Sequence, residues 1–577
     1  MHGIICFILL IPVPFRSIYY DDSIFTENGP CGTIASRNLK IFQEDRIVMS
    51  KDQIVGGKTV LGIEFGSTRI KSILIDREHN VIASGSHEWE NDYVDGIWTY
   101  SEEAILDGLR SSYADLKKDV FSRYGVPLKK LGGLGISAMM HGYLPFDREM
   151  NLLVPFRTWR NTITGDAAKE LTSLFNFNMP QRWSLSHLYQ AILNNEDHVK
   201  DIAFLTTLAG WIHYLLTGKK VLGVGDASGM MPIDSATCDY DAGMIRAFSG
   251  LVADRCYPWK LEDILPQVLC AGENAGTLTP EGAKLLDPEG DLEPGCPLCP
   301  PEGDAGTGMA ATDSVRERTG NVSAGTSIFS MIVLERPMSR VYPEIDIVTT
   351  PTGKQVGMVH CNSCTSEINA WVSVFREFAA LMGFETDVGD VFRKLFIKSR
   401  EADKDCGGLV AFNYFAGEPV TGVPDGRPMF IRLPDARFNL ANFMRSQIYA
   451  SMETLKYGME IMKHEQVAID RVYGHGGLFK TEGVAQYDLA AAIHAPVTVM
   501  ETAGEGGAWG IALLADYMVY RSDGESLEDY LDNHVFNGMK QFTVTPDPED
   551  EKGFDIYMKR FVSCLSALNM AAANFRD

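Results

Sequence analysis

Residues 61–76 read LGIEFGSTRIKSILID, and the fold class can be predicted from this stretch outward. Two apolar runs rich in β-branched residues flank Gly66, Ser67 and Thr68, so the pattern predicts two strands joined by a tight turn. Because glycine lets a ligand approach the backbone closely, the turn suits a phosphate, with Arg69 and Lys71 as further donors. A strand follows the turn where a P-loop or a dinucleotide fingerprint would have a helix, and both are therefore excluded.

A second copy of the pattern strengthens this interpretation. Residues 322–335 read VSAGTSIFSMIVLE, with Gly325, Thr326 and Ser327 in the positions of the first glycine and its two hydroxyl residues. A single Gly-Ser-Thr hairpin is more often only a turn. Its duplication predicts two related lobes that hold a ligand between two hydroxyl-lined turns.

Composition limits the class of partner and the compartment. The chain has 577 residues, 45% of them hydrophobic and 22% charged, which is ordinary for a globular protein with a large core. A formal net charge of -24 with no basic stripe argues against a nucleic-acid partner. The apolar run at residues 4–15 contains two prolines and is too short to span a membrane, so we expect a cytoplasmic protein with no membrane segment. Residues 1–54 are expected to be a disordered extension or to include a misassigned start, with Met49 as the alternative start.

The cysteines form two close pairs, Cys296 with Cys299 and Cys361 with Cys364. These pairs lie too far apart in the sequence for the common zinc ribbon, so buried or free thiols are the preferred interpretation.

Several stretches between and after the hairpins carry polar groups suited to a ligand. A buried strand at residues 131–136 leads to Met140, His141 and Gly142, and the carboxyl end of such a strand is a usual ligand position in an α/β sheet. His141 is equally explained as a buried core histidine. Residues 155–161, PFRTWRN, place Trp159, Arg160 and Asn161 together, which suits a polyol or an anchored surface loop.

One aspartate stands out among glycines. Asp304 lies in the sequence PEGDAGTG, where its carboxylate is sterically reachable just before the second hairpin. The alternative is an aspartate that bonds its own turn. Two later glycine clusters, residues 474–477 and 504–510, allow close approach to a flat ligand or close helix packing. Helices are predicted at residues 102–124, 167–175, 186–193, 202–216, 445–462, 508–520 and 558–573.

Together these motifs resemble the FGGY family of carbohydrate kinases, within the actin and hexokinase superfamily, over residues 59–520. Within that family the chain is most similar to the xylulose kinase group, through Met140, His141, Gly142, Trp159 and the DASG sequence at residues 226–229. The resemblance implies an α/β fold of two actin-like, ribonuclease H-like lobes, each a mixed sheet flanked by helices, with the active site in the cleft between them. It implies domains at residues 55–312 and 313–525, and a helical tail at 526–577.

The resemblance also implies roles for individual residues. Asp304 is the expected catalytic base, and Met140, His141, Arg160 and Asn161 are the expected sugar contacts. The expected ATP phosphate contacts are Gly66, Ser67, Thr68, Lys71, Gly325, Thr326 and Ser327. The expected adenosine contacts are Gly476, Gly477, Gly506, Gly507 and Ala508.

This chain departs from the family pattern at three places. Trp159, Arg160 and Asn161 replace a more usual Trp-x-Asp sequence. Glu64 stands where the family usually has aspartate and is the expected Mg²⁺ contact, through water. His475, Leu478 and Phe479 differ from the usual adenine loop.

The implied reaction is ATP-dependent phosphorylation of a small ketose, with D-xylulose as the first candidate and Mg²⁺ as cofactor. Two alternatives remain open: a kinase of another ketose or polyol, such as ribulose, rhamnulose or erythrulose, and a sugar-binding regulatory ATPase with weak transfer. A homodimer is compatible with the sequence.

Overall fold

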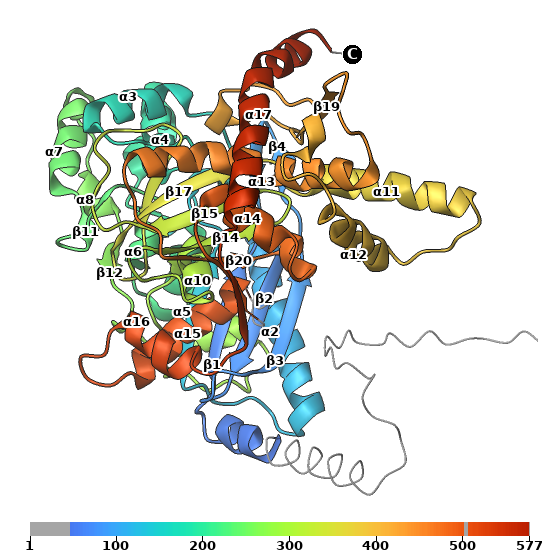
Figure 1. Cartoon of the computed structure of the whole chain (residues 1–577). Helices are drawn as coiled ribbons and strands as arrows, with labels where there is room; N and C mark the ends of the chain where they lie inside the picture. Colours follow the sequence, from blue (N-terminus) through green and yellow to red (C-terminus); the bar gives the residue numbers. More distant parts are fainter. Residues whose placement is uncertain (1–46, 501–505, 576–577) are drawn as a thin grey trace, which may run out of the picture. The chain divides into compact units, whose positions relative to one another are not determined.

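The computed structural model describes residues 47–500 and 506–575 (Figure 1). From Gln53 onward the described residues belong to one compact unit. Residues 1–46 of the expected N-terminal extension therefore lie outside the described residues.

The first sheet has five strands in the order β13-β6-β1-β2-β3. Their bounds are β1 Val60–Phe65, β2 Arg69–Ile75, β3 Val81–Glu88, β6 Gly133–Ala138 and β13 Glu302–Gly303. Strands β1 and β2 form the predicted antiparallel hairpin, in which Glu64 pairs with Lys71, while β6 runs parallel to β1 on its other side. The prediction of a hairpin from residues 61–76 is confirmed.

The second sheet has seven strands in the order β16-β17-β15-β14-β20-β21-β22. Their bounds are β14 Thr319–Ala324, β15 Ile328–Val333, β16 Asp346–Thr349, β17 Gln355–Cys361, β20 Arg471–His475, β21 Val497–Met500 and β22 Gln541–Val544. Here β14 and β15 are antiparallel and β20 is parallel to β14, which repeats the arrangement of β1, β2 and β6. The duplication seen in the sequence is therefore a duplication of topology.

Two helices from opposite ends of the chain cover the first sheet. Helix α2, Glu102–Tyr124, has the predicted bounds; Ser101 caps its start and Gly125 ends it in a left-handed conformation. Helix α15, Gly506–Tyr520, packs directly on β1, because a Cβ at Gly62 would lie 2.1 Å from the carbonyl oxygen of Ala508. Only glycine at this position allows that approach.

Helix α13, Leu440–His464, packs against β15 and β17 of the second sheet (Figure 1). Its methionines, Met452, Met459 and Met462, are buried in the core of this lobe, as the sequence predicts. On the other face of the sheet, Met331 and Val356 belong to a core shared with the first lobe. The lobes are therefore packed against each other.

The remaining helices include one correction. Residues 202–216, expected to be one helix, contain strand β8, Phe204–Thr206, followed by helix α5, Leu208–Thr217. The Thr207 side chain accepts from the amide of Gly210 and so fixes the helix start after the strand. Other helices are α3 Gly165–Phe175, α4 Ser184–Leu193, α6 Val224–Ala227, α7 Ala242–Leu251, α8 Leu261–Ile264, α9 Pro280–Leu286, α10 Asp304–Ala310, α11 Ser366–Leu381, α12 Val388–Ser399, α14 Ala485–Ile493, α16 Leu527–Tyr530 and α17 Pro548–Asn574.

The other strands are short: β4 Asp92–Val94, β5 Ile97–Thr99, β7 Leu144–Phe146, β9 Val221–Gly223, β10 Ile233–Asp234, β11 Asp239–Tyr240, β12 Gln267–Leu269, β18 Leu409–Phe412 and β19 Met429–Arg432. Among residues 47–500 and 506–575, no helix is long and apolar enough to cross a bilayer. The four paired cysteines are buried free thiols, as the preferred interpretation of the sequence predicts.

Candidate active site

The first hairpin turn is held by two stacked aromatic side chains. The carbonyl oxygen of Gly66 accepts from the Trp89 indole at 2.7 Å, and that of Ser67 accepts from the Tyr100 hydroxyl at 2.6 Å. The two rings are stacked with centroids 4.0 Å apart. In a planar trans peptide the N–H points opposite to the carbonyl, so the amides of Ser67 and Thr68 point away from these rings. The turn thus directs two amides away from its aromatic supports, and the binding of a phosphate there stays a prediction.

The second turn has the same arrangement with different supports. The carbonyl oxygen of Gly325 accepts from the Thr365 amide at 3.2 Å and from its hydroxyl at 2.7 Å, and the Cys364 amide donates to the carbonyl of Thr326 at 2.9 Å. Thr326 is exposed, and a Cβ at Gly325 would meet nothing within 4 Å. By the same peptide geometry, the amides of Thr326 and Ser327 point away from α11.

The first late glycine cluster lies beside this second turn. Gly476 has φ of 102°, and a Cβ there would lie 2.4 Å from the carbonyl oxygen of Ala324 at the end of β14. Gly477 is exposed and faces open space. Phe479, one of the departures from the family pattern, is buried beneath Gly474, so its ring belongs to the core. Burial lowers the pKa of His475 to about 4, which leaves its imidazole neutral at pH 7.

The second glycine cluster meets Glu64. The amide of Ala508 donates to Glu64 Oε2 at 3.1 Å, and a Cβ at Gly507 would lie 2.2 Å from Oε1. Burial, followed by the charge of Asp304, raises the pKa of Glu64 to about 7, while Lys71 across the hairpin opposes the shift. The structure therefore places Gly506, Gly507 and Ala508 beside the carboxylate of Glu64. Their contact with adenosine stays a prediction.

Asp304 begins α10, directly after β13, and its side chain is exposed. The Met140 amide donates to Asp304 Oδ1 at 3.1 Å, and the Ser137 and Thr307 hydroxyls, 3.1 Å apart, tie β6 to α10. Surrounding protein desolvates the carboxylate and raises its pKa, although it still reaches solvent. Exposure together with desolvation is what a carboxylate on a concave surface experiences.

His141 follows β6 in a left-handed conformation with φ of 73°. Its imidazole is buried, stacks on Trp183 with ring centroids 6.1 Å apart, and its Nδ1 lies 3.2 Å from the carbonyl oxygen of Gly229. Burial, then the neighbouring Arg182 guanidinium, lowers its pKa well below the ordinary value, so the ring is neutral. Each of the two sequence interpretations of His141 is therefore correct in part. The imidazole is buried, as in a core histidine, and the residue follows Met140, whose amide binds the exposed carboxylate of Asp304.

The DASG sequence lies behind this strand end. Asp226 is fully buried; its Oδ2 accepts from the Thr207 hydroxyl at 2.6 Å, and its Oδ1 has no hydrogen-bond partner among the described residues. Its own amide donates to Glu302 at 2.9 Å. Burial raises the pKa of Asp226 to about 7 and that of Glu302 to about 8. Both carboxyl groups lie next to Gly303, the residue before Asp304. A Cβ at Gly303 would lie 3.1 Å from Asp226 Oδ1.

Arg160 and Asn161 anchor a tryptophan that the sequence analysis did not single out. The Arg160 guanidinium lies 4.0 Å from the Trp98 ring centroid, and Asn161 bonds both the amide and the carbonyl of Trp98, at 2.9 and 2.8 Å. Asn161 is buried, and its amide also donates to Thr158. These bonds make Asn161 a support for β5, and its contact with a sugar stays a prediction.

The structure adds a link between the lobes that no sequence motif indicated. Arg182, beside His141, forms an ion pair with Asp346 on β16 of the second sheet, and Asn178 donates to the same carboxylate at 2.9 Å. Nearby, the Thr349 amide donates to the Ser228 hydroxyl at 3.0 Å. Residues so distant in sequence carry no shared pattern, so only the fold could bring them together.

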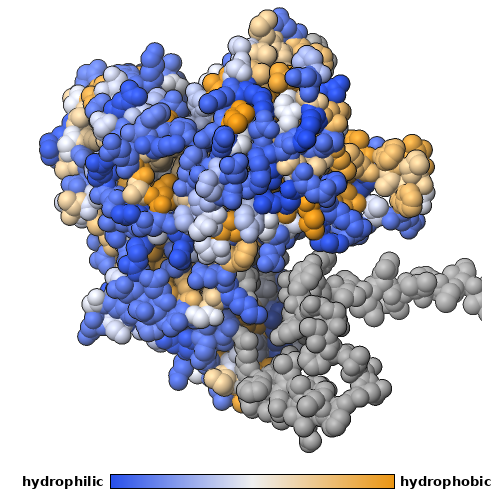
Figure 2. Space-filling model, in the orientation of Figure 1, coloured by the Kyte–Doolittle hydropathy of each residue, from blue (hydrophilic) through white to orange (hydrophobic). Residues whose placement is uncertain are grey.

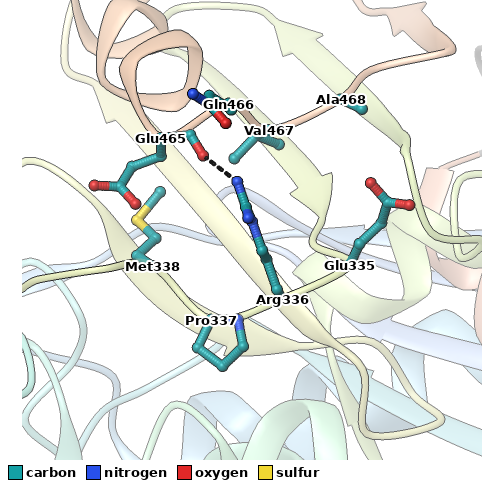
Figure 3. Close-up of a pocket in the computed structure, with 8 residues that line it drawn as sticks. All are labelled: Glu335, Arg336, Pro337, Met338, Glu465, Gln466, Val467 and Ala468. Atoms are coloured by element: carbon teal, nitrogen blue, oxygen red, sulfur yellow. Dashed lines mark hydrogen bonds between the residues drawn. The ribbon is translucent and has the colours of Figure 1, made fainter.

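A separate shallow pocket is lined by the start of the β15–β16 connection and the end of α13 (Figure 3). Arg336 crosses it and donates to the carbonyl of Glu465 at 3.1 Å. None of the predicted site residues lines it. Within the described residues no group of three or more histidine, cysteine or acidic side chains is arranged to hold a metal ion.

Two packed lobes that share one ribonuclease H-like strand arrangement, each with a hairpin turn between its first two strands, are the fold of the actin-like class of phosphotransferases. The chain belongs to the FGGY family of carbohydrate kinases: the family's N-terminal domain matches residues 59–290 and its C-terminal domain matches residues 320–519. The protein is accordingly a phosphotransferase of the sugar kinase type.

Individual relatives agree with this assignment. The chain is 21% identical to a xylulose kinase of Haemophilus influenzae over 531 residues, covering 88% of this chain and 99% of that one. It is 24% identical over 265 residues to a glycerol kinase of Thermococcus gammatolerans, covering 44% and 48%. Among solved structures, a ligand-bound xylulose kinase from Lactobacillus acidophilus superimposes with a TM-score of 0.70 at 16% identity, covering 90% of this chain and all of that one. A gluconate kinase from the same species gives a TM-score of 0.71 at 15% identity, covering 90% and 99%.

Proposed function

We propose that the protein transfers the γ-phosphate of ATP to a hydroxyl of a small ketose, with D-xylulose as the first candidate substrate. The observation that carries this proposal is the environment of Asp304. Its carboxylate is exposed, is oriented by the Met140 amide at 3.1 Å, and lies near Glu64 and the first anion-binding turn. A carboxylate with a raised pKa is a better proton acceptor than one with an ordinary pKa, provided that it is ionised at the working pH.

On the donor side, the two turns would hold the phosphates through their outward amides and hydroxyls, with Lys71 as a nearby cation. Gly476 and Gly477 would lie against adenosine, and we retain this role for Gly506, Gly507 and Ala508 as a prediction. We place the sugar-binding domain at residues 55–312, the nucleotide-binding domain at 313–525 and a tail at 526–577.

The residues around Glu64 fit a magnesium ion. The charge of Asp304 raises the pKa of Glu64, and a nearby cation would relieve that repulsion. Because no cluster of three ligands exists among the described residues, the ion would be held mainly by ATP phosphates and water, with Glu64 contacting it through water. Bound there, it would neutralise charge on the transferred phosphoryl group.

On the acceptor side, the sugar would lie against Met140 and His141, with Arg160 at the edge. The neutral imidazole of His141 has Nδ1 next to the Gly229 carbonyl, which favours the Nδ1–H tautomer and leaves Nε2 as an acceptor for a sugar hydroxyl. Asp304 would take the proton of the attacking hydroxyl as the new P–O bond forms and the bond to ADP breaks.

A regulatory ATPase with weak transfer is the second candidate. The observation favouring it is the adenine loop, where Phe479 is buried in the core and His475 is held neutral. These features change the surface offered to adenine without removing the reachable Asp304.

The test measures ADP release from Mg-ATP by the full-length protein with D-xylulose, ribulose, rhamnulose, erythrulose, glycerol and gluconate. We expect one ketose to stimulate release strongly, with the sugar phosphate as product by mass spectrometry. Stimulation by glycerol or gluconate alone would replace the ketose assignment. If folded protein bound ATP and no sugar raised the basal rate, the transfer reaction would be refuted in favour of the regulatory candidate.

A further inference from the structure

Three successive carbonyl groups of the first hairpin turn are held by one pair of residues. The Trp89 indole donates to the carbonyl oxygen of Gly66 at 2.7 Å, and the backbone amide of Trp89 donates to that of Thr68 at 3.2 Å. Between them, the carbonyl oxygen of Ser67 accepts from the Tyr100 hydroxyl at 2.6 Å. Within residues 47–500 and 506–575, the amides of Ser67 and Thr68 donate no hydrogen bond. Because each carbonyl points opposite to the next amide, holding the carbonyls leaves these two amides free on the other side of the turn.

The two aromatic residues form one rigid support. Trp89 is 8% exposed, Tyr100 is 2% exposed, and their rings are stacked with centroids 4.0 Å apart. Phe65, the last residue of β1, packs edge-on against Trp89 with ring centroids 6.0 Å apart. The Asn91 amide donates to the Tyr100 hydroxyl at 2.6 Å, which leaves the hydroxyl proton for the carbonyl of Ser67. Burial raises the pKa of Tyr100 to about 12, so the hydroxyl keeps that proton at neutral pH.

Tyr100 also contacts the strand end that orients the proposed base. Its hydroxyl lies 3.8 Å from Met139 Sδ, and the amide of Met139 donates to the carbonyl of Phe65 at 3.0 Å. The next residue, Met140, donates its amide to Asp304 at 3.1 Å. One side chain therefore touches both the turn and the end of β6, so it fixes the spacing between the turn and Asp304.

The second turn has a different kind of support. Its carbonyl oxygens accept from the amides of Cys364 and Thr365, just before α11, and from the Thr365 hydroxyl. Those amides belong to the backbone and remain after any substitution except proline. In the first turn, by contrast, two of the three donors are side-chain groups. The orientation of the first turn is therefore encoded by side chains that a substitution can remove.

We propose that Trp89 and Tyr100 are positioning residues for phosphoryl transfer, which hold the first turn toward the phosphates and in register with Asp304. This inference rests on the proposed kinase reaction, because it assigns the turn to ATP. Both residues act through carbonyl groups of the turn, on the side opposite to its free amides. Phosphoryl transfer needs the attacking hydroxyl and the leaving oxygen in line, so a rotated turn should lower the rate more than the affinity.

The test removes each donor and keeps an aromatic ring in its place. Trp89→Phe removes the indole N–H, and Tyr100→Phe removes only the hydroxyl. Tyr124→Phe is the matched control, because the Tyr124 hydroxyl donates to the carbonyl of Ile82 at 3.2 Å, at the far end of β3 from Trp89. Kinetics of the full chain are measured with Mg-ATP and the sugar that stimulates ADP release. Calorimetry measures the binding of a non-hydrolysable ATP analogue with Mg²⁺.

We expect kcat to fall by roughly 10–100-fold in both single variants, because a misplacement of about 1 Å costs that much. The affinity for the analogue should fall by about 3–10-fold, and the KM for the sugar should stay within about twofold of the wild type. The double variant should lose less than the product of the two single losses, since both residues act on one turn. Tyr124→Phe should match the wild type in all three quantities. A support that is only structural would lower the melting temperature and leave these quantities unchanged.

Two results would overturn the proposal. One is a kcat and an analogue affinity within about twofold of the wild type in both single variants, and the other is an equal loss in Tyr124→Phe. If Trp89→Phe does not fold, Tyr100→Phe decides, because it removes a single hydroxyl and keeps the stacked ring.

Failure of the proposed function gives a separate result. A wild type that binds the analogue and phosphorylates no sugar would refute the transfer reaction. The analogue affinities of the two variants would then decide whether Trp89 and Tyr100 hold the turn for a phosphate. A wild type that does not bind the analogue would overturn both proposals.

Discussion

Replacing the proposed base by its amide, Asp304→Asn, separates proton acceptance from positioning. The carboxylate accepts from the Met140 amide at 3.1 Å, and the asparagine oxygen can accept the same hydrogen bond. What is lost is the ability to take a proton from the sugar hydroxyl. A positioned general base contributes about 10²–10⁴ to the rate, so kcat should fall by that factor, which corresponds to about 3–5 kcal/mol of barrier. The KM for the sugar should change only a few-fold.

The assay is sugar-stimulated ADP release at saturating Mg-ATP, with melting temperature measured in parallel. Desolvation raises the pKa of Asp304, so ionising it in the folded protein is unfavourable and the amide should not lower stability at neutral pH. A loss of activity therefore cannot be attributed to unfolding. The wild-type rate should fall as pH drops through this raised pKa, because the protonated acid cannot accept a proton, and this limb should be missing from the residual activity of Asp304→Asn.

Asp304→Ala serves as the matched comparison, since it removes both the base and the acceptor for the Met140 amide. We expect a similar kcat but a larger rise in the KM for the sugar, because the strand end that contacts it is released. The reasoning would be refuted if Asp304→Asn kept kcat within about tenfold of the wild type, a loss too small for a general base.

Three further predictions concern the surroundings of the site. Gly507→Ala would place a Cβ 2.2 Å from Glu64 Oε1 and displace this carboxylate. The KM for Mg-ATP should therefore rise by roughly 10–100-fold. An unchanged KM would exclude Glu64 from the metal site. Arg182→Met and Asp346→Asn each break the ion pair between the lobes. Each should lower the free energy of unfolding by about 1–3 kcal/mol, and the double variant should lower it by less than the sum. Additive shifts in melting temperature would contradict this coupling. Burial raises the pKa of Asp226 to about 7, so the folded protein holds this proton more tightly than the unfolded chain does. The protonated carboxyl therefore contributes stability at low pH. This contribution, up to roughly 4 kcal/mol, is lost as pH rises from about 4 to 7. Melting temperature should therefore fall less steeply over this range in Asp226→Asn than in the wild type, and parallel curves would argue against the raised pKa.

The local elements were predictable because local rules generate them. The bounds of α2 follow from apolar spacing, a serine cap and a terminal glycine, and all three signals lie within the helix or next to it. The hairpin at residues 61–76 follows in the same way from two β-branched runs around a glycine. The one helix assigned wrongly, at residues 202–216, failed where a three-residue strand precedes the cap at Thr207, because so short a strand has too few residues for a periodic signal.

The composition of the candidate site was also visible in the sequence, whereas the contacts made by each residue were not. Asp304 and His141 were singled out by their motifs, but the hydrogen bond from Met140 and the close approach of Glu64 join residues far apart in the chain. Asn161 has the right chemistry for a sugar, yet tertiary packing directs its amide to Trp98. A motif specifies which groups are present, and only packing decides which partners use their hydrogen-bonding capacity.

By itself, the sequence determined two hydroxyl-lined hairpins, a glycine-flanked aspartate and the order that relates them to sugar kinases, because these are short-range patterns read directly from residue types. Only the tertiary structure decided that α15, from near the end of the chain, closes over β1 and brings Gly507 against Glu64, and that Arg182 reaches Asp346 in the other lobe. It alone left Val374, Phe378 and Leu381 of α11 exposed to solvent, in the region that Figure 2 shows as an apolar protrusion. Burial, and the pKa shifts that follow from it, depend on which distant segments pack together, and no local pattern encodes that choice.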